Sequence, residues 1–263
     1  SYSIPINIEI TANKKDAKNL FNNGIKCLIH YISEKTREIK DLRSINVFDN
    51  NNNMLNSTST TLEKGFIFKY NGKDIYYAKA NQYTFTDIED IMLKQYAQLI
   101  ASKKIIPIEV GNNIFNPDKE ITKGEFISYI SNKLGAKSDK SYFKDMKPDY
   151  KYFKEVNGVY ELGVLPPIYD EKTDFNEKIN KQDMIYMVIR CYEVNDKNDN
   201  NIKSASLLYR DKSEIDVWAR VKTSIASKLK IIPDDGYLEP KSSGTKLFAA
   251  ELFYKLLRTE KIF

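Results

Sequence analysis

Three lysines occupy positions where a positive charge could bind an anion. Lys123, Lys181 and Lys246 each directly follow a residue predicted to cap a helix. The helix dipole makes a cation in the first turn unfavourable by about 0.3–1 kcal/mol, so three such lysines need a cause. A helix N-terminus also offers unpaired N–H groups that attract anions. The pattern favours binding of a carboxylate or phosphate group; alternatively, these are solvated surface lysines of a lysine-rich chain.

The residues around these lysines carry the signals of helix starts. Thr122 and Glu125 match a capping box, in which each side chain bonds the backbone N–H of the other residue. Asn180 and Thr245 take the place of Thr122 in two later segments. We interpret Glu125 and its counterpart Asp183 as helix-capping groups rather than as catalytic acids.

Three aspartates stand just before other predicted helices. Their simplest role is to cap those helices or to lie close to the cap, since aspartate is a preferred N-cap residue. The alternative role is hydrogen bonding to a ligand in a groove. Each aspartate ends a three-residue opening that begins with an aromatic residue: Phe85-Thr86-Asp87, Phe143-Lys144-Asp145 and Tyr209-Arg210-Asp211.

Other residue types argue against several kinds of site. His30 is the single histidine, so a multi-histidine zinc site is excluded, and no nucleophile motif accompanies it. We interpret Cys27 and Cys191, far apart in the sequence, as buried free thiols. Trp218, the one tryptophan, lies on a predicted amphipathic helix as a core residue, or as a sugar-stacking platform if a ring face is exposed. No metal site and no cofactor are expected.

Composition narrows the class of protein. The 263 residues carry 41 basic and 36 acidic side chains, a net charge of +5, and the two signs are mixed along the chain. This argues against a nucleic-acid-binding protein, which would cluster its basic residues. No membrane span is expected, because apolar runs end well before the roughly 20 residues that a spanning helix needs. No targeting leader is visible at Ser1.

Residues 1–82 predict a small α+β domain whose role the sequence does not indicate. Alternating isoleucines in residues 2–10 predict a strand. Apolar spacing over residues 16–42 predicts a helix, and residues 45–48 predict a second strand. Asn71-Gly72, between two further apolar runs, predicts a β-hairpin with a type I′ turn.

From Phe85 onward one pattern recurs three times, about every 60 residues, a length typical of helical repeats. Each copy has the aromatic-x-aspartate opening, an amphipathic helix, two apolar residues before a proline that stops the helix, an irregular loop and a second helix. We predict an α+β fold overall, in which the N-terminal domain precedes a mostly α unit. That unit would consist of three helix-loop-helix repeats at residues 83–136, 141–194 and 207–260.

These landmarks, from Phe85 to about Arg258, resemble the S-layer homology repeat. That family shows an aromatic-x-Asp opening, a helix, a Gly-Ile-Ile-like turn, a Phe-x-Pro loop and a Thr-Arg-Ala-Glu helix start. Lysine replaces the arginine in all three copies here, and the turn glycine is kept only as Gly163. The three helix starts read Thr-Lys-Gly-Glu at 122–125, Asn-Lys-Gln-Asp at 180–183 and Thr-Lys-Leu-Phe at 245–248.

The resemblance implies a pseudo-threefold unit that anchors extracellular proteins to a secondary polysaccharide of the bacterial cell wall, often a pyruvylated one, through grooves between repeats. We therefore expect a non-catalytic protein of the cell wall or S-layer. The alternatives are an assembly protein that self-associates in a surface layer through its divergent repeats, and an enzyme with two carboxylates about 5–10 Å apart acting on a glycan. The candidate polysaccharide-binding residues are Lys123, Lys181, Lys246, Asp87, Asp145, Asp211, Gly163 and Trp218.

Overall fold

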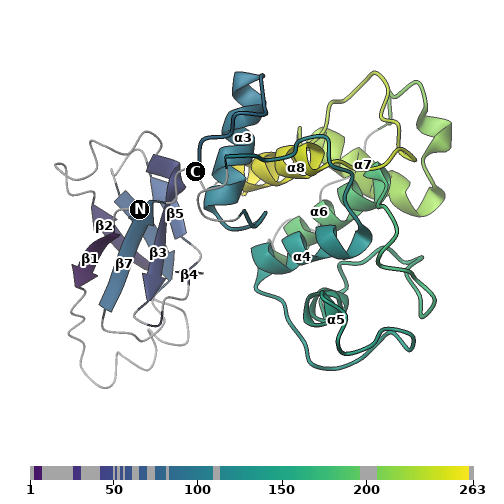
Figure 1. Ribbon diagram of the computed structural model, residues 1–263. Helices are drawn as coiled ribbons and strands as arrows, with labels where there is room; N and C mark the ends of the chain where they lie inside the picture. The colour runs from purple at the N-terminus through teal and green to yellow at the C-terminus, as the bar shows by residue number, and fades with distance from the viewer. Residues whose placement is uncertain are drawn as a thin grey trace. The chain divides into compact units, whose positions relative to one another are not determined.

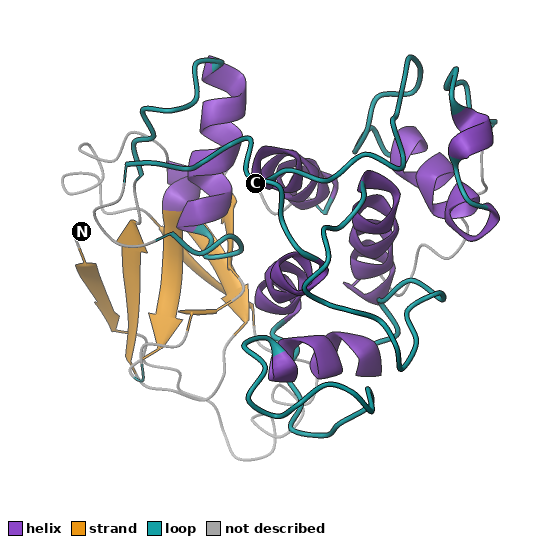
Figure 2. Cartoon of the chain, turned by 45° about the vertical axis from the view of Figure 1, so that its right-hand side comes forward, coloured by secondary structure: helices purple, strands orange, loops and turns teal. Residues whose placement is uncertain are grey.

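The computed structural model describes residues 3–7, 26–30, 42–49, 51, 54–55, 57–60, 65–69, 75–80, 83–108, 113–195 and 206–260. The chain divides into two compact units, one within Ser1–Thr84 and the other spanning Phe85–Glu260. Within the described residues, the strands belong to the first unit and the α-helices to the second (Figure 2). The chain is therefore mostly helical with a smaller β part, which is consistent with an α+β protein.

The first unit contains two antiparallel sheets. Their strand orders are β1-β7-β3-β4 and β2-β6-β5. Strand β3 is buried along its whole length, with Val47 and Phe48 in the core. The elements are β1 (Ser3–Asn7), β2 (Lys26–His30), η1 (Leu42–Ser44), β3 (Ile45–Asp49), β4 (Met54–Leu55), β5 (Ser57–Thr60), β6 (Gly65–Lys69) and β7 (Ile75–Ala80).

Two expectations for this unit are wrong. Residues 26–30, inside the helix expected over 16–42, form strand β2, because a short apolar run such as Cys27-Leu28-Ile29 fits a strand as well as a helix. The expected hairpin is also absent. Strand β6 pairs with β2 and β5, whereas β7 pairs with β1 and β3. Asn71-Gly72 lies outside the described residues, and its local signal does not determine which strands pair.

The second unit contains three successive helix pairs (Figure 1). Helix α6 contacts both α4 and α8, so the second helices of the pairs form the centre. Each first helix packs on the second helix of another pair: α3 on α8, α5 on α4, and α7 on α6. The pairs are therefore interlocked. The bounds are α3 (Ile91–Ser102), α4 (Lys123–Leu134), α5 (Phe153–Glu161), α6 (Lys181–Asn195), η2 (Lys212–Glu214), α7 (Val217–Lys228) and α8 (Lys246–Thr259).

Helix α5 runs through Asn157-Gly158, which the sequence indicated as an interruption. A Cβ atom on Gly158 would lie 2.5 Å from the backbone nitrogen of Lys137 and 2.6 Å from the carbonyl carbon of Ala136. The glycine is needed because another backbone segment approaches this face of the helix closely.

The segments that lead into α4, α6 and α8 meet in a closed ring of backbone hydrogen bonds. Ile121 donates to the carbonyl of Gly244 at 3.1 Å, Gly244 donates to Ile179 at 2.7 Å, and Ile179 donates to Ile121 at 3.1 Å. The side chains of Ile121 and Ile179 are fully buried. The starts of the three central helices, where the candidate lysines lie, are thus fixed relative to one another.

The turns that follow the first helices share a left-handed backbone conformation, with φ values of 56° at Lys104, 65° at Gly163 and 58° at Lys230. A residue with a Cβ atom pays roughly 1–2 kcal/mol for this conformation, which glycine adopts freely. The glycine that the sequence retains at 163 thus suits the backbone of the turn.

We expect Lys230→Gly to be about 1 kcal/mol more stable than Lys230→Ala, because only the alanine keeps the left-handed strain. Both variants lose the Lys230–Asp234 ion pair, so the comparison isolates the backbone. Urea unfolding followed by the fluorescence of Trp218, the single tryptophan and a residue of α7, measures the difference in this unit. Equal stability of the two variants would contradict the strain argument.

Candidate functional site

The helix starts are capped as the sequence predicts. Thr122 and Glu125 form a complete capping box at α4: the Thr122 hydroxyl accepts from the Glu125 N–H at 3.1 Å, and the Glu125 carboxylate accepts from the Thr122 N–H at 3.0 Å. At α8 the Thr245 hydroxyl accepts from the Phe248 N–H at 3.1 Å. At α6 the Asn180 side chain accepts from the N–H three residues on, at 2.9 Å.

The expected unpaired N–H groups at these helix starts are not available, which corrects the sequence argument for anion binding. At α4, the N–H groups of Lys123 and Gly124 donate to carbonyls of the loop between α5 and α6, at 2.9 and 2.8 Å. The first two N–H groups of α6 donate to the loop before α8, and those of α8 to the loop before α4. Neighbouring loops therefore satisfy the helix ends. Any anion binding must come from the lysine side chains.

Two of the three lysine side chains are already neutralised. The Lys123 ammonium pairs with Glu177 at 2.5 Å, and the Lys181 ammonium pairs with Glu239 at 2.7 Å. Each glutamate lies in the loop that satisfies the helix start of its lysine. The lysine side chains are only 16% and 21% exposed, whereas their glutamate partners are 61% and 64% exposed, so each pair lies at the surface with its lysine side partly covered.

Lys246 differs from the other two because the segment Phe115-Asn116-Pro117, in the loop that reaches its helix start, carries no glutamate. Within the part of the chain that the structure describes, Lys246 forms no ion pair. Its ammonium lies 4.7 Å above the centre of the Phe115 ring. Burial and then the charge of Lys119 lower the pKa of Lys246, although Glu125 and Asp87 oppose the shift. Lys246 is thus a half-buried cation short of a counter-charge.

The Asp87 and Asp211 side chains hold loops in place and cap no helix, although Asp211 stands at the N-cap position of η2; this corrects the capping role expected of them. The Asp87 carboxylate accepts from the N–H groups of Phe115, at 2.9 Å, and Asn116, at 2.6 Å. Asp211 accepts in the same way from Leu238 at 3.1 Å and from Glu239 at 2.6 Å. Each aspartate therefore clasps a loop that lies 27 to 29 residues further along the chain.

The residues that cap these helices, or stand at their caps, come slightly later. Asp90 caps α3 by accepting from the Leu93 N–H at 2.8 Å, and Asp216 occupies the N-cap position of α7. Asp145, the third predicted aspartate, clasps no loop: within the described residues its carboxylate accepts no hydrogen bond. The three aspartates thus do not share one role.

Gly163 lines an open cavity of about 720 Å³, and its carbonyl accepts from Arg190 Nε at 3.0 Å. The rings of Tyr142 and Tyr160 lie 4.9 Å apart at this cavity, and both are partly exposed. The cavity also reaches Tyr169, whose ring lies 5.6 Å from the Lys123 ammonium. Gly163 and the tyrosine next to Lys123 therefore line the same cavity.

Trp218 is half-buried, and its ring packs edge-on against Tyr186 of α6 at 5.3 Å between ring centres. Among the described residues, it neither lines the Gly163 cavity nor contacts the ammonium groups of the three lysines. Its contacts are those of a residue that packs α7 against α6. Among the thiols, Cys191 is free and fully buried, as predicted, and burial raises its pKa to about 12. The side chain of Cys27 is outside the described residues.

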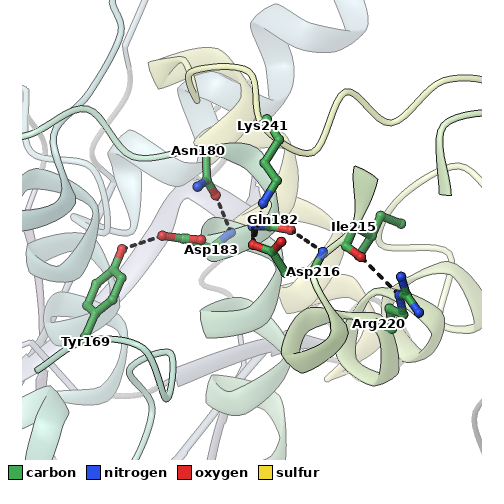
Figure 3. A network of polar contacts seen from close by, with 8 residues as sticks. All are labelled: Tyr169, Asn180, Gln182, Asp183, Ile215, Asp216, Arg220 and Lys241. Carbon is green, nitrogen blue, oxygen red and sulfur yellow. Dashed lines mark hydrogen bonds and ion pairs between the residues drawn. The ribbon is translucent and has the colours of Figure 1, made fainter. Parts of the chain in front are cut away.

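A network of polar contacts, buried at Gln182 and Asp183 and exposed at Lys241, joins α6 to neighbouring segments, and sequence reasoning did not anticipate it (Figure 3). The Tyr169 hydroxyl donates to Asp183 at 2.7 Å, while the other Asp183 oxygen is buried without a partner. Gln182 donates to Asp216 at 2.6 Å and accepts from its N–H at 3.1 Å. Lys241 forms an ion pair with the same Asp216 carboxylate.

Burial raises the pKa of Asp183, against the opposing effect of its hydrogen bonds. The sequence suggested only a capping role for Asp183. In the structure its side chain also accepts a hydrogen bond from Tyr169. No group of three or more metal-ligating side chains occurs within the described residues. None of the helices described is long and apolar enough to cross a membrane.

Comparison with known proteins gives two distant relatives. The chain is 27% identical over 185 residues to an endoglucanase of Bacillus sp. (strain KSM-635), an alignment that covers 68% of this chain and 19% of that protein. It is 28% identical over 116 residues to a cell surface protein of Thermoanaerobacter kivui, covering 41% of this chain and 15% of that protein. The chain thus corresponds to less than a fifth of either relative. No family model matches the chain.

Proposed function

We propose that residues 83–136, 141–194 and 207–260 are three divergent S-layer homology repeats around a pseudo-threefold axis. The ring of hydrogen bonds through Ile121, Ile179 and Gly244 supports this arrangement, as does the packing of each first helix on another pair. The relative named as a cell surface protein supports a place at the bacterial surface. In this proposal the chain is extracellular and anchors a protein to the cell wall or S-layer.

The ligand we propose is an anionic secondary polysaccharide of the cell wall, and the single observation that carries it is Lys246. A half-buried ammonium without an ion-pair partner is unfavourable by itself, and an incoming carboxylate would supply the missing counter-charge. The Phe115 ring under the ammonium is fully buried, and Lys119 beside it pairs with Glu125 at 2.6 Å, so the Lys246 ammonium is the charge left for a ligand. A pyruvyl group on a sugar supplies a carboxylate for it.

Lys123 and Lys181 take a secondary place in this proposal, because Glu177 and Glu239 already neutralise them. An anion at either groove would have to compete with a carboxylate of the protein. The aspartates Asp87 and Asp211 act through the loops they clasp, and Gly163 acts through the turn it allows. The main anion site is then the junction between the start of α8 and the loop before α4.

Sedimentation with purified cell-wall sacculi tests the anchoring function. The full chain should pellet with sacculi that carry their secondary polysaccharide and stay in the supernatant with sacculi chemically stripped of it. Equal pelleting with both preparations would assign binding to peptidoglycan instead. No pelleting with either would overturn the anchoring function.

We further propose that this chain does not itself catalyse a reaction. The acid whose environment most resembles that of a glycosidase general acid is Asp183, since burial raises its pKa. However, only 1% of Asp183 is exposed, so a sugar cannot reach its carboxylate in this structure. An assay for reducing sugar released from β-glucan and from cell-wall glycan should give no product; release of product would contradict the proposal.

A second candidate function is assembly in a surface layer. Large apolar side chains are exposed on two first helices: Ile91 and Met92 of α3 are 75% and 58% exposed, and Val217 and Val221 of α7 are 77% and 53% exposed. Side chains of this kind favour protein contacts. Concentration-dependent oligomers in sedimentation velocity, without any glycan, would favour this candidate, and a monomer at all concentrations would contradict it.

A further inference from the structure

The middle helix pair contains a cavity that belongs to none of the lysine sites. It has a volume of about 370 Å³ and lies between residues 143–150 and residues 171–176. Phe143 and Phe175, whose rings meet edge to face at 4.9 Å, form an apolar floor that is almost fully buried, with 3% and 4% of each residue exposed. Asp145 and Tyr150 also line the cavity.

The cavity lies where the other two helix pairs have a closed clasp. In those pairs, Asp87 and Asp211 each accept two backbone N–H groups from the loop, and a backbone bond next to each aspartate adds to the closure: Thr86 donates to Asn113, and Arg210 to Gly236. Among the described residues, Asp145 accepts no such bond, and the N–H of Phe175 has no acceptor. The middle clasp is therefore open.

The sequence supplies a cause for the open clasp. The Asn176 N–H, which corresponds to an N–H that Asp87 or Asp211 accepts, donates instead to Asp174 at 2.8 Å. The residues at the position of Asp174 in the other loops are Ile114 and Tyr237, which offer no carboxylate. The backbones differ accordingly: Asn116 and Glu239 have φ values of 58° and 54°, whereas the corresponding Asn176 is not among the described residues with positive φ. Asp174 thus accepts the Asn176 N–H in place of Asp145, and the Asp145 carboxylate is left without a hydrogen bond among the described residues.

The charged residues around the cavity favour a positively charged ligand. Four carboxylates and two lysines line it, an excess of two negative charges. An ammonium group would pair with Asp145 and gain from the nearby aromatic rings. Phe175 also lines the cavity, and its N–H, which has no acceptor among the described residues, can donate to a hydroxyl oxygen of the same ligand. The charged lining residues are Asp145, Asp149, Glu171, Asp174, Lys147 and Lys172.

We propose that this cavity binds a pyranose that carries a free ammonium group next to a hydroxyl, as a non-acetylated glucosamine unit does. Asp145 pairs with the ammonium, the Phe175 N–H donates to the hydroxyl oxygen, and the half-buried Tyr150 in the lining contacts the apolar face of the sugar. This site differs from the Lys246 site in place and in the sign of the charge it takes. It does not depend on the proposed anchoring function.

Titration calorimetry of the full chain with a glucosamine trimer and with its fully N-acetylated form tests the proposal. We expect the glucosamine trimer to bind and the acetylated trimer to bind at least about 10-fold more weakly, because acetylation removes the charge that Asp145 pairs with. Equal binding of the two trimers, or binding of neither, would overturn the proposal. Monomeric glucosamine, tested in parallel, should bind as well if one sugar unit fills the cavity.

Asp145→Asn provides the test at the residue level. We expect it to weaken binding of the glucosamine trimer about 10- to 100-fold, as the loss of a charged hydrogen-bond partner does. Asp139→Asn is the matched control, since it makes the same charge change at an exposed aspartate that is paired with Lys154 outside the cavity. Asp139→Asn should change the affinity less than about 2-fold. Unaltered binding by Asp145→Asn, or an equal loss in both variants, would contradict the assignment.

Discussion

Replacing Asp211 by asparagine should lower the free energy of unfolding of the helical unit by about 2–3 kcal/mol. The two Asp211 oxygens accept from Leu238 and Glu239, and both bonds are made by a charged acceptor. Asparagine has the same shape but offers one acceptor oxygen and presents an NH₂ group to the second N–H. One backbone donor in a buried setting then loses its partner, since Asp211 itself is only 7% exposed.

Asp145→Asn is the matched control for this prediction, because the corresponding aspartate clasps nothing. It should change the free energy of unfolding by less than about 0.5 kcal/mol. Urea unfolding followed by the fluorescence of Trp218 compares the two variants in the unit that contains both. A loss of the same size in both variants would show that the clasp is not the source of the effect.

The same clasp makes stability depend on pH in a defined direction. Burial alone would raise the pKa of Asp211, but the hydrogen bonds from Leu238 and Glu239, with the charge of Lys181, outweigh burial and lower it. The pKa of Asp87 is lowered in the same way. A lowered pKa in the folded state means that the stabilisation is present above the unfolded pKa, about 4, and is lost as the pH falls through the folded pKa. The free energy of unfolding of Asp211→Asn should therefore fall less steeply with decreasing pH than that of the unsubstituted chain.

Lys246→Ala should weaken binding of the anionic wall polysaccharide about 10- to 100-fold, the largest effect that we expect of any single lysine. The reason is that Lys246 has no carboxylate partner in the described part of the chain, so its charge is available to the ligand. Lys123→Ala and Lys181→Ala should each cost less than about 3-fold, because Glu177 and Glu239 already pair with those lysines. Calorimetry with the soluble polysaccharide gives the three values.

Glu177→Gln tests the same reasoning in the opposite direction. It removes the carboxylate from Lys123 while leaving the shape of the loop unchanged, so the Lys123 charge becomes available and the affinity should rise. Lys246→Arg should keep most of the affinity. If Lys123→Ala weakened binding as much as Lys246→Ala does, the distinction between paired and unpaired lysines would be wrong.

Local signals in the sequence predicted local structure well. The caps at Thr122 and Thr245 form as expected, because a capping box depends on residues three apart. The roles of Asp87 and Asp211 were not predictable in the same way. Their hydrogen-bond partners lie 27 to 29 residues further along the chain. An aspartate just before a helix indicates a cap, and no local signal shows that it binds a distant loop instead.

The difference among the three lysines also depends on contacts between segments distant in sequence. In the sequence Lys123 and Lys246 occupy equivalent positions, and nothing local separates them. The structure separates them because the loop that reaches each helix start comes from a different helix pair and carries Glu177 in one case and Pro117 in the other. The failed hairpin has a similar cause, since Asn-Gly predicts a turn and does not specify which strands pair.

The most direct test of anion binding at Lys246 is titration of the full chain with the soluble secondary polysaccharide before and after its carboxyl groups are reduced to neutral alcohols. We predict binding of the acidic polymer that weakens as salt is added, and at least about 10-fold weaker binding of the neutral polymer. Equal affinity for the acidic and the neutral polymer would contradict this prediction, because Lys246 would then have no carboxylate to pair with.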